Sequence, residues 1–337
     1  MRRARLTSIR KIEIDRKCPE PVITSPEQVL LKIRYSAVNS DDFNVFSGAL
    51  PTPYDDRTLL HETAGEIVDL GEDAKRLGFA VGDHVTTNVS FGCGVCPMCR
   101  QGKVNLCLDK HGVGASSDLL LLDGTSLVHL PKEISLKEGA LYWLATCCIR
   151  GVERAGIQPN QSVLIIGGGS TGQMLLQIIK KRMPRVVVVS ELIESKRELA
   201  LRLGADEVID PNVENLEERA LDLTGGLGFD VVIDAAGALN ALENVTSLIA
   251  RGGTLMLYSY YKVSDYLRLN LMETYWKELT VVSSYGADLA HYTGSEVRTL
   301  EYLDLQSLIG EIVPFEKMQE AFEQYGTHEK LRILIEY

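Results

Sequence analysis

The second half of the chain alternates short apolar runs with stretches that have the periodicity of amphipathic helices. The apolar runs contain almost no polar residue, which is typical of strands buried on both faces of a parallel sheet. Strands and helices in this order form βαβ units, and a series of such units predicts a doubly wound domain. The predicted strands are 163–166, 186–189, 231–233 and 254–257, and the predicted helices are 173–181, 195–203 and 239–250.

The chain before about residue 140 instead shows short β-type runs separated by turns that contain glycine and proline. Many short strands separated by turns with glycine and proline predict a barrel-like β domain. After about residue 283 the pattern becomes mixed, with a predicted amphipathic helix at 315–325 and a final strand at 330–335. The strands predicted in the first part are 29–35, 66–70, 81–85 and 126–130.

The composition is that of an ordinary globular protein, with 45% hydrophobic and 24% charged residues among 337. A chain of this length predicts about two domains. The formal net charge of −11 disfavours a binder of nucleic acid or of an anionic membrane, because both partners are themselves negative. The sequence shows neither a signal peptide nor a membrane span, and we therefore expect a cytoplasmic protein.

A glycine-rich segment follows the first strand of the βαβ series and precedes its first helix. Gly167, Gly169 and Gly172 have the G-x-G-x-x-G spacing, in which the glycines allow a tight turn, approach of a pyrophosphate and close helix packing. Glu191 ends the next strand, where a carboxylate accepts hydrogen bonds from an adenosine ribose and repels a 2′-phosphate. The sequence therefore predicts a dinucleotide site that prefers NAD(H) to NADP(H). The alternative is a simple strand–helix turn with a surface glutamate.

Four of the seven cysteines lie in one glycine-rich loop, at Cys93, Cys96, Cys99 and Cys107. A reducing compartment disfavours disulfides, so this cluster points to a bound metal. Four thiolates surround Zn²⁺ tetrahedrally and leave no open position for a substrate, which predicts one structural zinc ion per chain. An iron–sulfur cluster is the alternative, because similar spacings serve it.

The cysteine loop upstream of the glycine motif resembles the zinc-containing medium-chain dehydrogenase/reductase superfamily, whose members include sorbitol, threonine and alcohol dehydrogenases. Further matches are 60–65 for the family's G-H-E-x-x-G, 81–85 for its G-D-x-V, and the segments 234–237 and 251–254. The resemblance covers essentially the whole chain.

This resemblance implies an α/β protein with two domains and an active-site cleft between them. A GroES-like β-barrel domain is expected at 1–143, completed by 284–337, and a Rossmann NAD-binding domain with a doubly wound parallel sheet at 144–283. The family also implies a homodimer or homotetramer, often formed by extending the Rossmann sheet across a two-fold axis.

The chain departs from the family at the positions that hold its catalytic zinc. Asn39 stands in place of the first ligand, a cysteine, and Trp143 falls near the third. Neither side chain suits zinc. The second ligand is present as His61, whereas Asn44 replaces the family's proton-relay histidine. We therefore expect an active site that works without metal.

Two other arrangements would keep a metal at this place. One is a weaker site built from His61, Glu62 and either Asp41 or Asp42. The other takes its third ligand from the adjacent cysteines, Cys147 and Cys148, whose simpler interpretation is two small buried side chains in a helix.

Without zinc, hydride transfer needs another group to polarise a carbonyl or to take a hydroxyl proton. His61 and Asp41 are the candidates, with Glu62 beside them, because a histidine or a burial-shifted carboxyl can do this work near neutral pH. The resemblance implies an NAD(H)-dependent oxidoreductase of a small hydroxy or carbonyl compound of the polyol, sugar or cyclitol type. The alternatives are a zinc-independent reductase of conjugated C=C bonds and a catalytically silent NAD-binding protein.

Overall fold

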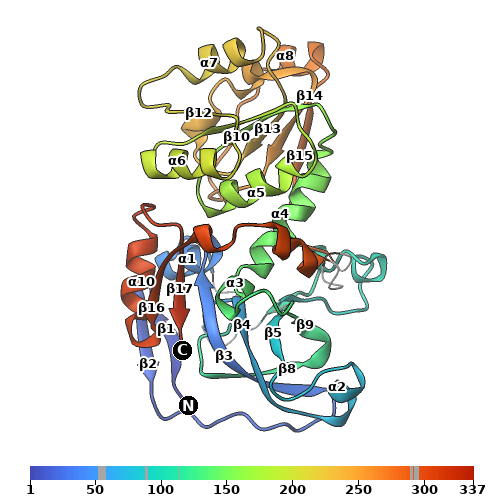
Figure 1. Ribbon diagram of the computed structural model, residues 1–337, viewed down its shortest axis with the longest axis vertical. Coiled ribbons are helices and arrows are strands. Elements are labelled where there is room, and N and C mark those ends of the chain that lie inside the picture. The colour runs from blue at the N-terminus through green and yellow to red at the C-terminus, as the bar shows by residue number, and fades with distance from the viewer. Residues whose placement is uncertain (52–57, 88–89, 113, 289–290, 292–295) are drawn as a thin grey trace. The chain divides into compact units, whose positions relative to one another are not determined.

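A computed structural model describes residues 1–51, 58–87, 90–112, 114–288, 291 and 296–337 (Figure 1). The chain divides into two compact units: unit 1 consists of 1–146 and 287–337, and unit 2 consists of 147–286. The first boundary falls within helix α4 (Tyr142–Ala155). None of the helices in the described ranges combines the length and the hydropathy that a membrane-spanning segment needs.

Unit 2 contains a six-stranded sheet in which every neighbouring pair of strands is parallel. Its strands are β10 (Ser162–Ile166), β11 (Val186–Ser190), β12 (Glu207–Ile209), β13 (Phe229–Asp234), β14 (Ile249–Leu257) and β15 (Thr280–Ser283). They lie in the order β12, β11, β10, β13, β14, β15. The first strand, β10, is central, the next two strands extend the sheet to one edge, and the last three extend it to the other. This is the order of a doubly wound nucleotide-binding sheet, whose switch point lies between β10 and β13.

The helices of unit 2 follow the strands, as in a series of βαβ units. They are α5 (Ser170–Lys180), α6 (Glu194–Arg202), α7 (Leu216–Leu223) and α8 (Leu271–Trp276). Strand β10 is buried along its whole length, because helices and neighbouring strands cover it on every side. The strands predicted from apolar runs all form, and β14 begins earlier than predicted, at Ile249.

The helix predicted at 239–250 is wrong. The structure has two short 3₁₀ turns there, Leu239–Leu242 and Val245–Leu248. Between them, Asn244 has a φ of 56°, in the left-handed region, which interrupts any continuous right-handed helix. Leu242, Val245, Leu248 and Ile249 are still buried, so the spacing identified the inner face of the segment but not its backbone conformation.

Unit 1 is built around a mixed sheet of seven strands, in the order β16, β17, β3, β4, β5, β9, with β8 paired to β3. These strands are β3 (Gln28–Val38), β4 (Glu62–Leu70), β5 (His84–Thr87), β8 (Leu119–Asp123), β9 (Leu127–His129), β16 (Ile309–Pro314) and β17 (Arg332–Glu336). A hairpin of β1 (Arg3–Ser8) and β2 (Lys11–Asp15) and a pair of β6 (Ser90–Phe91) and β7 (His111–Gly112) complete the described strands. The helices are α1 (Ser40–Ser47), α2 (Glu72–Arg76), α3 (Leu136–Gly139), part of α4, and α10 (Met318–Tyr325).

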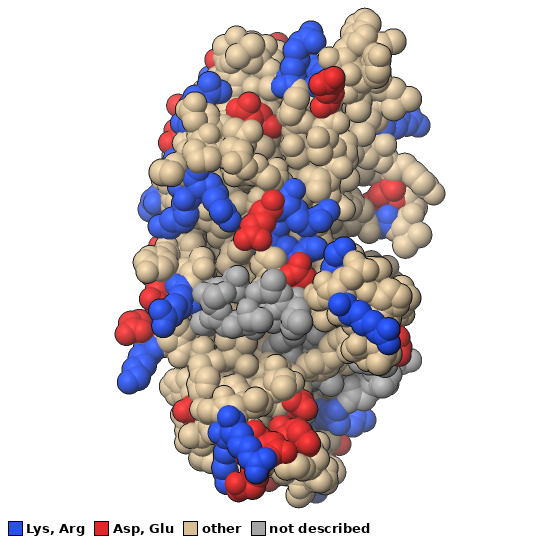
Figure 2. Space-filling model, turned by 90° about the vertical axis from the view of Figure 1, so that its right-hand side faces the viewer, with Lys and Arg blue, Asp and Glu red and all other residues tan. Residues whose placement is uncertain are grey.

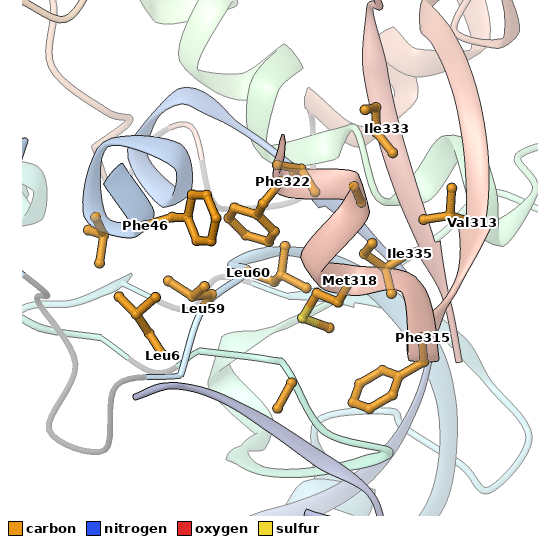
Figure 3. Packing of buried hydrophobic residues seen from close by; sticks show 14 residues of the cluster. Leu6, Phe46, Leu59, Leu60, Val313, Phe315, Met318, Phe322, Ile333 and Ile335 are labelled. Atoms are coloured by element: carbon orange, nitrogen blue, oxygen red, sulfur yellow. The ribbon is translucent and has the colours of Figure 1, made fainter. Parts of the chain in front are cut away.

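The C-terminal segment packs into unit 1 beside the first strands of the chain. Strand β17 pairs antiparallel with β3, so the last strand belongs to the same sheet as the first part of the sequence (Figure 1). In the apolar cluster of Figure 3, Phe46 of α1 faces Phe322 of α10, with ring centroids 5.1 Å apart. The helix predicted at 315–325 forms as a 3₁₀ turn, Phe315–Lys317, followed by α10. These contacts tie the chain's two ends together around the segment that precedes β4.

Charged side chains of both signs lie interspersed on the face shown in Figure 2. Exposed charges also pair within single elements of the structure, such as Lys75 with Glu72 in α2, at 2.6 Å. Exposed pairs of this kind contribute little to stability, about 0–1 kcal/mol. The net charge of −11 is therefore not gathered into one acidic patch on this face.

Candidate functional site

The glycine-rich loop between β10 and α5 makes close backbone approaches. Gly167 has a φ of 101°, which favours glycine because it has no Cβ. A Cβ at Gly172 would lie 1.9 Å from the carbonyl oxygen of Gly167, so the first turn of α5 packs directly on the loop. No atom of the described residues lies within 4 Å of a Cβ built on Gly169, which leaves space beside the backbone there.

The N-terminus of α5 is suited to hold an anion. Its N-cap residue is Gly169, which has no side chain that could bond to the first turn. The first N–H groups of the helix, at the positive end of its dipole, therefore remain available for phosphate oxygens. Loop and helix together fit the pyrophosphate of a dinucleotide.

Glu191 follows β11 and lies against the glycine loop. Its Oε2 accepts a hydrogen bond from the backbone N–H of Gly168 at 2.7 Å, and its Oε1 accepts one from Ile193 at 2.9 Å. A Cβ at Gly168 would lie 3.0 Å from the Cβ of Glu191, so this additional glycine allows the contact. Both carboxylate oxygens are fixed in place, and each keeps a further lone pair for a ribose hydroxyl.

The four cysteines of the glycine-rich loop come together, with sulfur atoms within 4.8 Å of one another. Backbone N–H groups point at the sulfurs: Cys93 donates to Cys107 at 3.2 Å, and Cys99 donates to Cys96 at 3.4 Å. The N–H groups of Leu108 and Cys99 lower the pKa of the Cys96 thiol to about 6. Four sulfur donors at this spacing, partly prepared as thiolates, fit a tetrahedral zinc ion.

His61 lies just before β4, buried among polar side chains from the start of α1. Its Nε2 is 3.2 Å from Asn39 Nδ2 and 3.8 Å from Asp41 Oδ2, and its Nδ1 is 3.6 Å from Asp42 Oδ1. Asn39 caps α1, because its Oδ1 accepts the Asp42 N–H at 3.0 Å. Only the amide nitrogen of Asn39 therefore faces His61, and it donates to the unprotonated Nε2 of the neutral imidazole.

The surrounding carboxylates favour the protonated imidazole. Burial lowers the pKa of His61, but the charges of Asp42, Asp41 and Glu62 outweigh burial and raise the pKa to about 9. The Asn39 amide acts in the opposite direction, since it binds the deprotonated nitrogen. Both protonation states of His61 thus have a partner in place, which suits a group that accepts and releases a proton.

Glu62, the first residue of β4, forms a buried ion pair with Arg332 of β17. Glu62 Oε1 accepts a hydrogen bond from Arg332 Nη2 at 2.9 Å, and each residue is 3% exposed. Burial raises the pKa of Glu62 to about 7, although Arg332 and His61 lower it. The structure therefore places Glu62 beside His61 in the chain but with its carboxylate held by the C-terminal strand.

The residue before His61 is in an unusual conformation. Leu60 has a φ of 66°, a left-handed conformation that costs a non-glycine residue about 1–2 kcal/mol. Its N–H donates to Asp42 Oδ1 at 2.8 Å, and its side chain is completely buried in the cluster of Figure 3. These contacts hold the conformation that directs His61 toward α1.

The residues around His61 do not fit the donor set of a catalytic zinc ion. An amide nitrogen is not a zinc ligand, and Trp143 meets the imidazole edge-on, with ring centroids 6.1 Å apart. Within the described part of the chain, the cysteine cluster is the only group of three or more His, Cys, Asp or Glu side chains with ligand atoms this close. Cys148 lies against Tyr258, with its sulfur 3.7 Å from the hydroxyl, which agrees with its simpler interpretation as a buried side chain.

Sequence reasoning missed Arg332 as part of this site. An arginine within the apolar run 331–335 was a signal, because a cation in a buried strand needs an anionic partner. Its partner was not predictable from the pattern, since Glu62 lies 270 positions away.

Comparisons with known proteins agree with this architecture. The chain matches the family models "Alcohol dehydrogenase GroES-like domain" at 25–132 and "Zinc-binding dehydrogenase" at 170–301. It is 30% identical to an L-threonine 3-dehydrogenase of Pyrococcus abyssi, over 93% of this chain and 90% of that protein. It is 26% identical to a sorbitol dehydrogenase of Halalkalibacterium halodurans, over 94% and 93%.

A solved structure shows the same fold over the full length. It is a putative zinc-binding dehydrogenase from Sinorhizobium meliloti bound to NADP, with a TM-score of 0.91 and 24% identity, covering 100% of this chain and 99% of that one. Sheet order, glycine loop and matches together define an oxidoreductase with a GroES-like and a Rossmann domain. The chain belongs to the zinc-type medium-chain dehydrogenase/reductase superfamily.

We expect the purified protein to contain about one zinc ion per chain, as a single closed four-cysteine site holds one. Cys96→Ser should lower the zinc content and the thermal stability of unit 1, because metal binding is coupled to folding. Elemental analysis of protein prepared without chelator measures the content, and Cys147→Ser is the matched control that should leave it unchanged. A content near two ions that falls to one in His61→Ala would contradict this assignment.

Proposed function

We propose that this oxidoreductase transfers a hydride between NAD(H) and a small polyol, sugar or cyclitol, with a structural zinc ion and no catalytic one. The observation that carries the proposal is the set of groups around His61. Where relatives of this class place a metal, this chain has an amide, an imidazole and carboxylates that bind one another.

Gly167, Gly169, Gly172 and Glu191 would hold the dinucleotide. The nicotinamide supplies or accepts the hydride when it is bound. The fold alone does not select between the two dinucleotides, since a relative of the same fold binds NADP. The carboxylate of Glu191 supports NAD(H), because both of its oxygens are fixed beside the glycine loop where a 2′-phosphate would be repelled.

His61 and Asp41 would handle the proton that accompanies the hydride. In carbonyl reduction, protonated His61 donates its proton to the oxygen that becomes a hydroxyl, and in oxidation it takes that proton back. Asp41 lies 3.8 Å from Nε2 with its side chain 37% exposed, so it can exchange the proton with water. Glu62 holds Arg332 and supports the protonated imidazole by its charge.

The site and one relative support the proposed substrate class. The side chain of Asp41 is 37% exposed and offers its Oδ2 as an acceptor for a hydroxyl of a polyol or sugar. A relative aligned over nearly the whole chain is a sorbitol dehydrogenase. Both points favour a neutral polyhydroxy compound.

A second copy of the chain is the expected partner. Strand β15 is the edge of the unit 2 sheet and pairs with β14 alone among the described strands. Val281 on this edge is 44% exposed, and the nearby α8 exposes Leu271, Tyr275 and Trp276 at 66–79%. An open edge flanked by apolar side chains favours pairing with the same strand of another copy about a two-fold axis. Light scattering should give the mass of a dimer or tetramer.

The function is tested by NADH and NADPH titration followed by a turnover screen. We expect tighter binding of NADH and turnover with polyols, ketoses or cyclitols. His61→Ala should lower kcat by about 10²–10⁴-fold, as expected for loss of a general acid or base, and leave the Kd for NADH unchanged. His84→Ala, which removes an exposed imidazole at the start of β5, is the matched control.

Two outcomes of this screen would replace the proposal. Turnover of conjugated enones without turnover of polyols or ketones would identify a C=C reductase. Binding of NADH with no turnover in either class would identify a catalytically silent protein.

The rate should also depend on pH through His61, whose pKa is raised to about 9. Reduction needs the protonated imidazole, so its rate should fall as the pH rises through about 9. Oxidation needs the deprotonated imidazole, so its rate should rise over the same range. In Asp41→Asn both inflections should move to lower pH, because one carboxylate that raises this pKa is lost. A profile that does not move would exclude the pairing of Asp41 with His61.

A further inference from the structure

Arg197 of α6 lies directly behind Glu191, and its guanidinium is enclosed by oxygen atoms. Its Nη1 donates to the backbone carbonyl of Glu191 at 2.8 Å and to that of Leu192 at 2.7 Å. Its Nη2 lies 2.7 Å from Asp210 Oδ2, and the two side chains are only 15% and 19% exposed. The guanidinium is thus hydrogen-bonded to the backbone that carries the Glu191 carboxylate.

Asp210 is itself held in place at the end of β12. Its Oδ1 accepts the backbone N–H of Asn212 at 3.0 Å, while Oδ2 faces Arg197. The N–H of Glu191 donates to the carbonyl of Ile209, the residue before Asp210, at 3.1 Å. The ends of β11 and β12 are therefore joined both through the backbone and through the ion pair.

Two cations of α6, Lys196 and Arg197, lie near carboxylates. Lys196 interacts electrostatically with Glu191, and Arg197 pairs with Asp210. A phosphate monoester carries about −1.5 to −2 charges at neutral pH. Because Arg197 is already paired with Asp210, a 2′-phosphate beside Glu191 would meet the negative charge of that carboxylate without gaining Arg197 as a partner.

We propose that Arg197 and Asp210 are positioning residues for cofactor selection, an inference that rests on the proposed preference for NAD(H). Arg197 acts through Glu191: by holding the 191–192 carbonyls it keeps the carboxylate over the Gly168 N–H, where the adenosine ribose would bind. Asp210 acts by keeping Arg197 turned toward the backbone and neutralised, so that the Arg197 guanidinium is not available to a 2′-phosphate.

The first test removes the charge of Asp210. In Asp210→Asn the Kd for NADPH should fall about tenfold, the scale of one charge-assisted hydrogen bond, and the Kd for NADH should change much less. Fluorescence titration with each nucleotide gives both constants without any substrate. Asp206→Asn is the matched control, because Asp206 pairs with Lys180 at 2.9 Å in the same unit and loses the same charge. It should leave the ratio of the two constants unchanged.

A second variant distinguishes two causes of a higher NADPH affinity: the release of Arg197 and the loss of the Asp210 negative charge. If Arg197 itself binds the 2′-phosphate once it is released, Asp210→Asn combined with Arg197→Ala should lose the gain in NADPH affinity. If the double variant keeps the full gain, or if Asp210→Asn alone leaves the Kd ratio where it was, the selecting role of Arg197 and Asp210 is wrong.

The positioning role is tested by a double-mutant cycle with Glu191. Arg197→Ala should weaken NADH binding in the unmodified protein and have little effect when Glu191 is already Gln. An equal loss in both backgrounds would show a merely structural role and overturn the proposal. Melting temperatures measured without nucleotide identify variants that fail to fold, and Arg197→Lys, which keeps the charge but not the fork of donors, should give an intermediate loss.

Different results would contradict the proposed preference for NAD(H) and the proposed role of Arg197 and Asp210. If the unmodified protein binds NADPH more tightly than NADH, the assignment of NAD(H) is wrong before any variant is made. If it prefers NADH and the variants at 197 and 210 do not change the ratio, only the positioning pair is refuted.

Discussion

The buried ion pair between Glu62 and Arg332 is the contact on which the arrangement of unit 1 depends. Removing one partner of such a pair costs about 3–5 kcal/mol, because a buried charge is left without its counterion. The pair fixes the first residue of β4, next to His61, to the first residue of β17, which in turn pairs with β3. The C-terminal strand therefore supports the segment that carries His61, even though 270 positions separate Glu62 from Arg332.

The two candidate sites rest on different physical features. In unit 2 the backbone makes the site: Gly172 allows contact between helix and loop, and the uncapped end of α5 offers N–H groups. In unit 1 the candidate site around His61 consists of side chains, and the contacts of each side chain determine which of its atoms faces the histidine. Asn39, for example, caps α1 with its oxygen, and this fixes which end of its amide meets His61.

This difference explains how much the sequence could predict. The glycine loop and the cysteine cluster are local motifs, so spacing alone was enough to place their residues together. Apolar runs predicted β10, β11, β13 and β14 of the parallel sheet but not the short edge strands β12 and β15. The helix predicted at 239–250 is wrong, because one left-handed residue, Asn244, breaks the segment. Asp41 was predicted beside His61 from the sequence, and the structure places the two side chains 3.8 Å apart. The partners of Glu62 and Glu191 could not be predicted, since the pair of Glu62 with Arg332 and the hydrogen bond from Gly168 to Glu191 exist only in the fold.

Electrostatics and geometry give different answers about which cation suits the site around His61. The carboxylates of Asp41, Asp42 and Glu62 outnumber the guanidinium of Arg332, and the buried Asp42 Oδ2 and Glu62 Oε2 accept no hydrogen bond from the described residues. This excess of negative charge would attract a divalent metal as well as a proton. A metal needs the lone pair of Nε2 together with further donors, but the Asn39 amide lies against Nε2 and Trp143 packs edge-on to the ring. A proton on Nδ1 instead faces Asp42 Oδ1, 3.6 Å away, while the Asn39 amide donates to Nε2, so the neutral imidazole has a partner at both ring nitrogens. These contacts of His61 support the proposed mechanism, in which the histidine handles a proton and does not bind a metal ion.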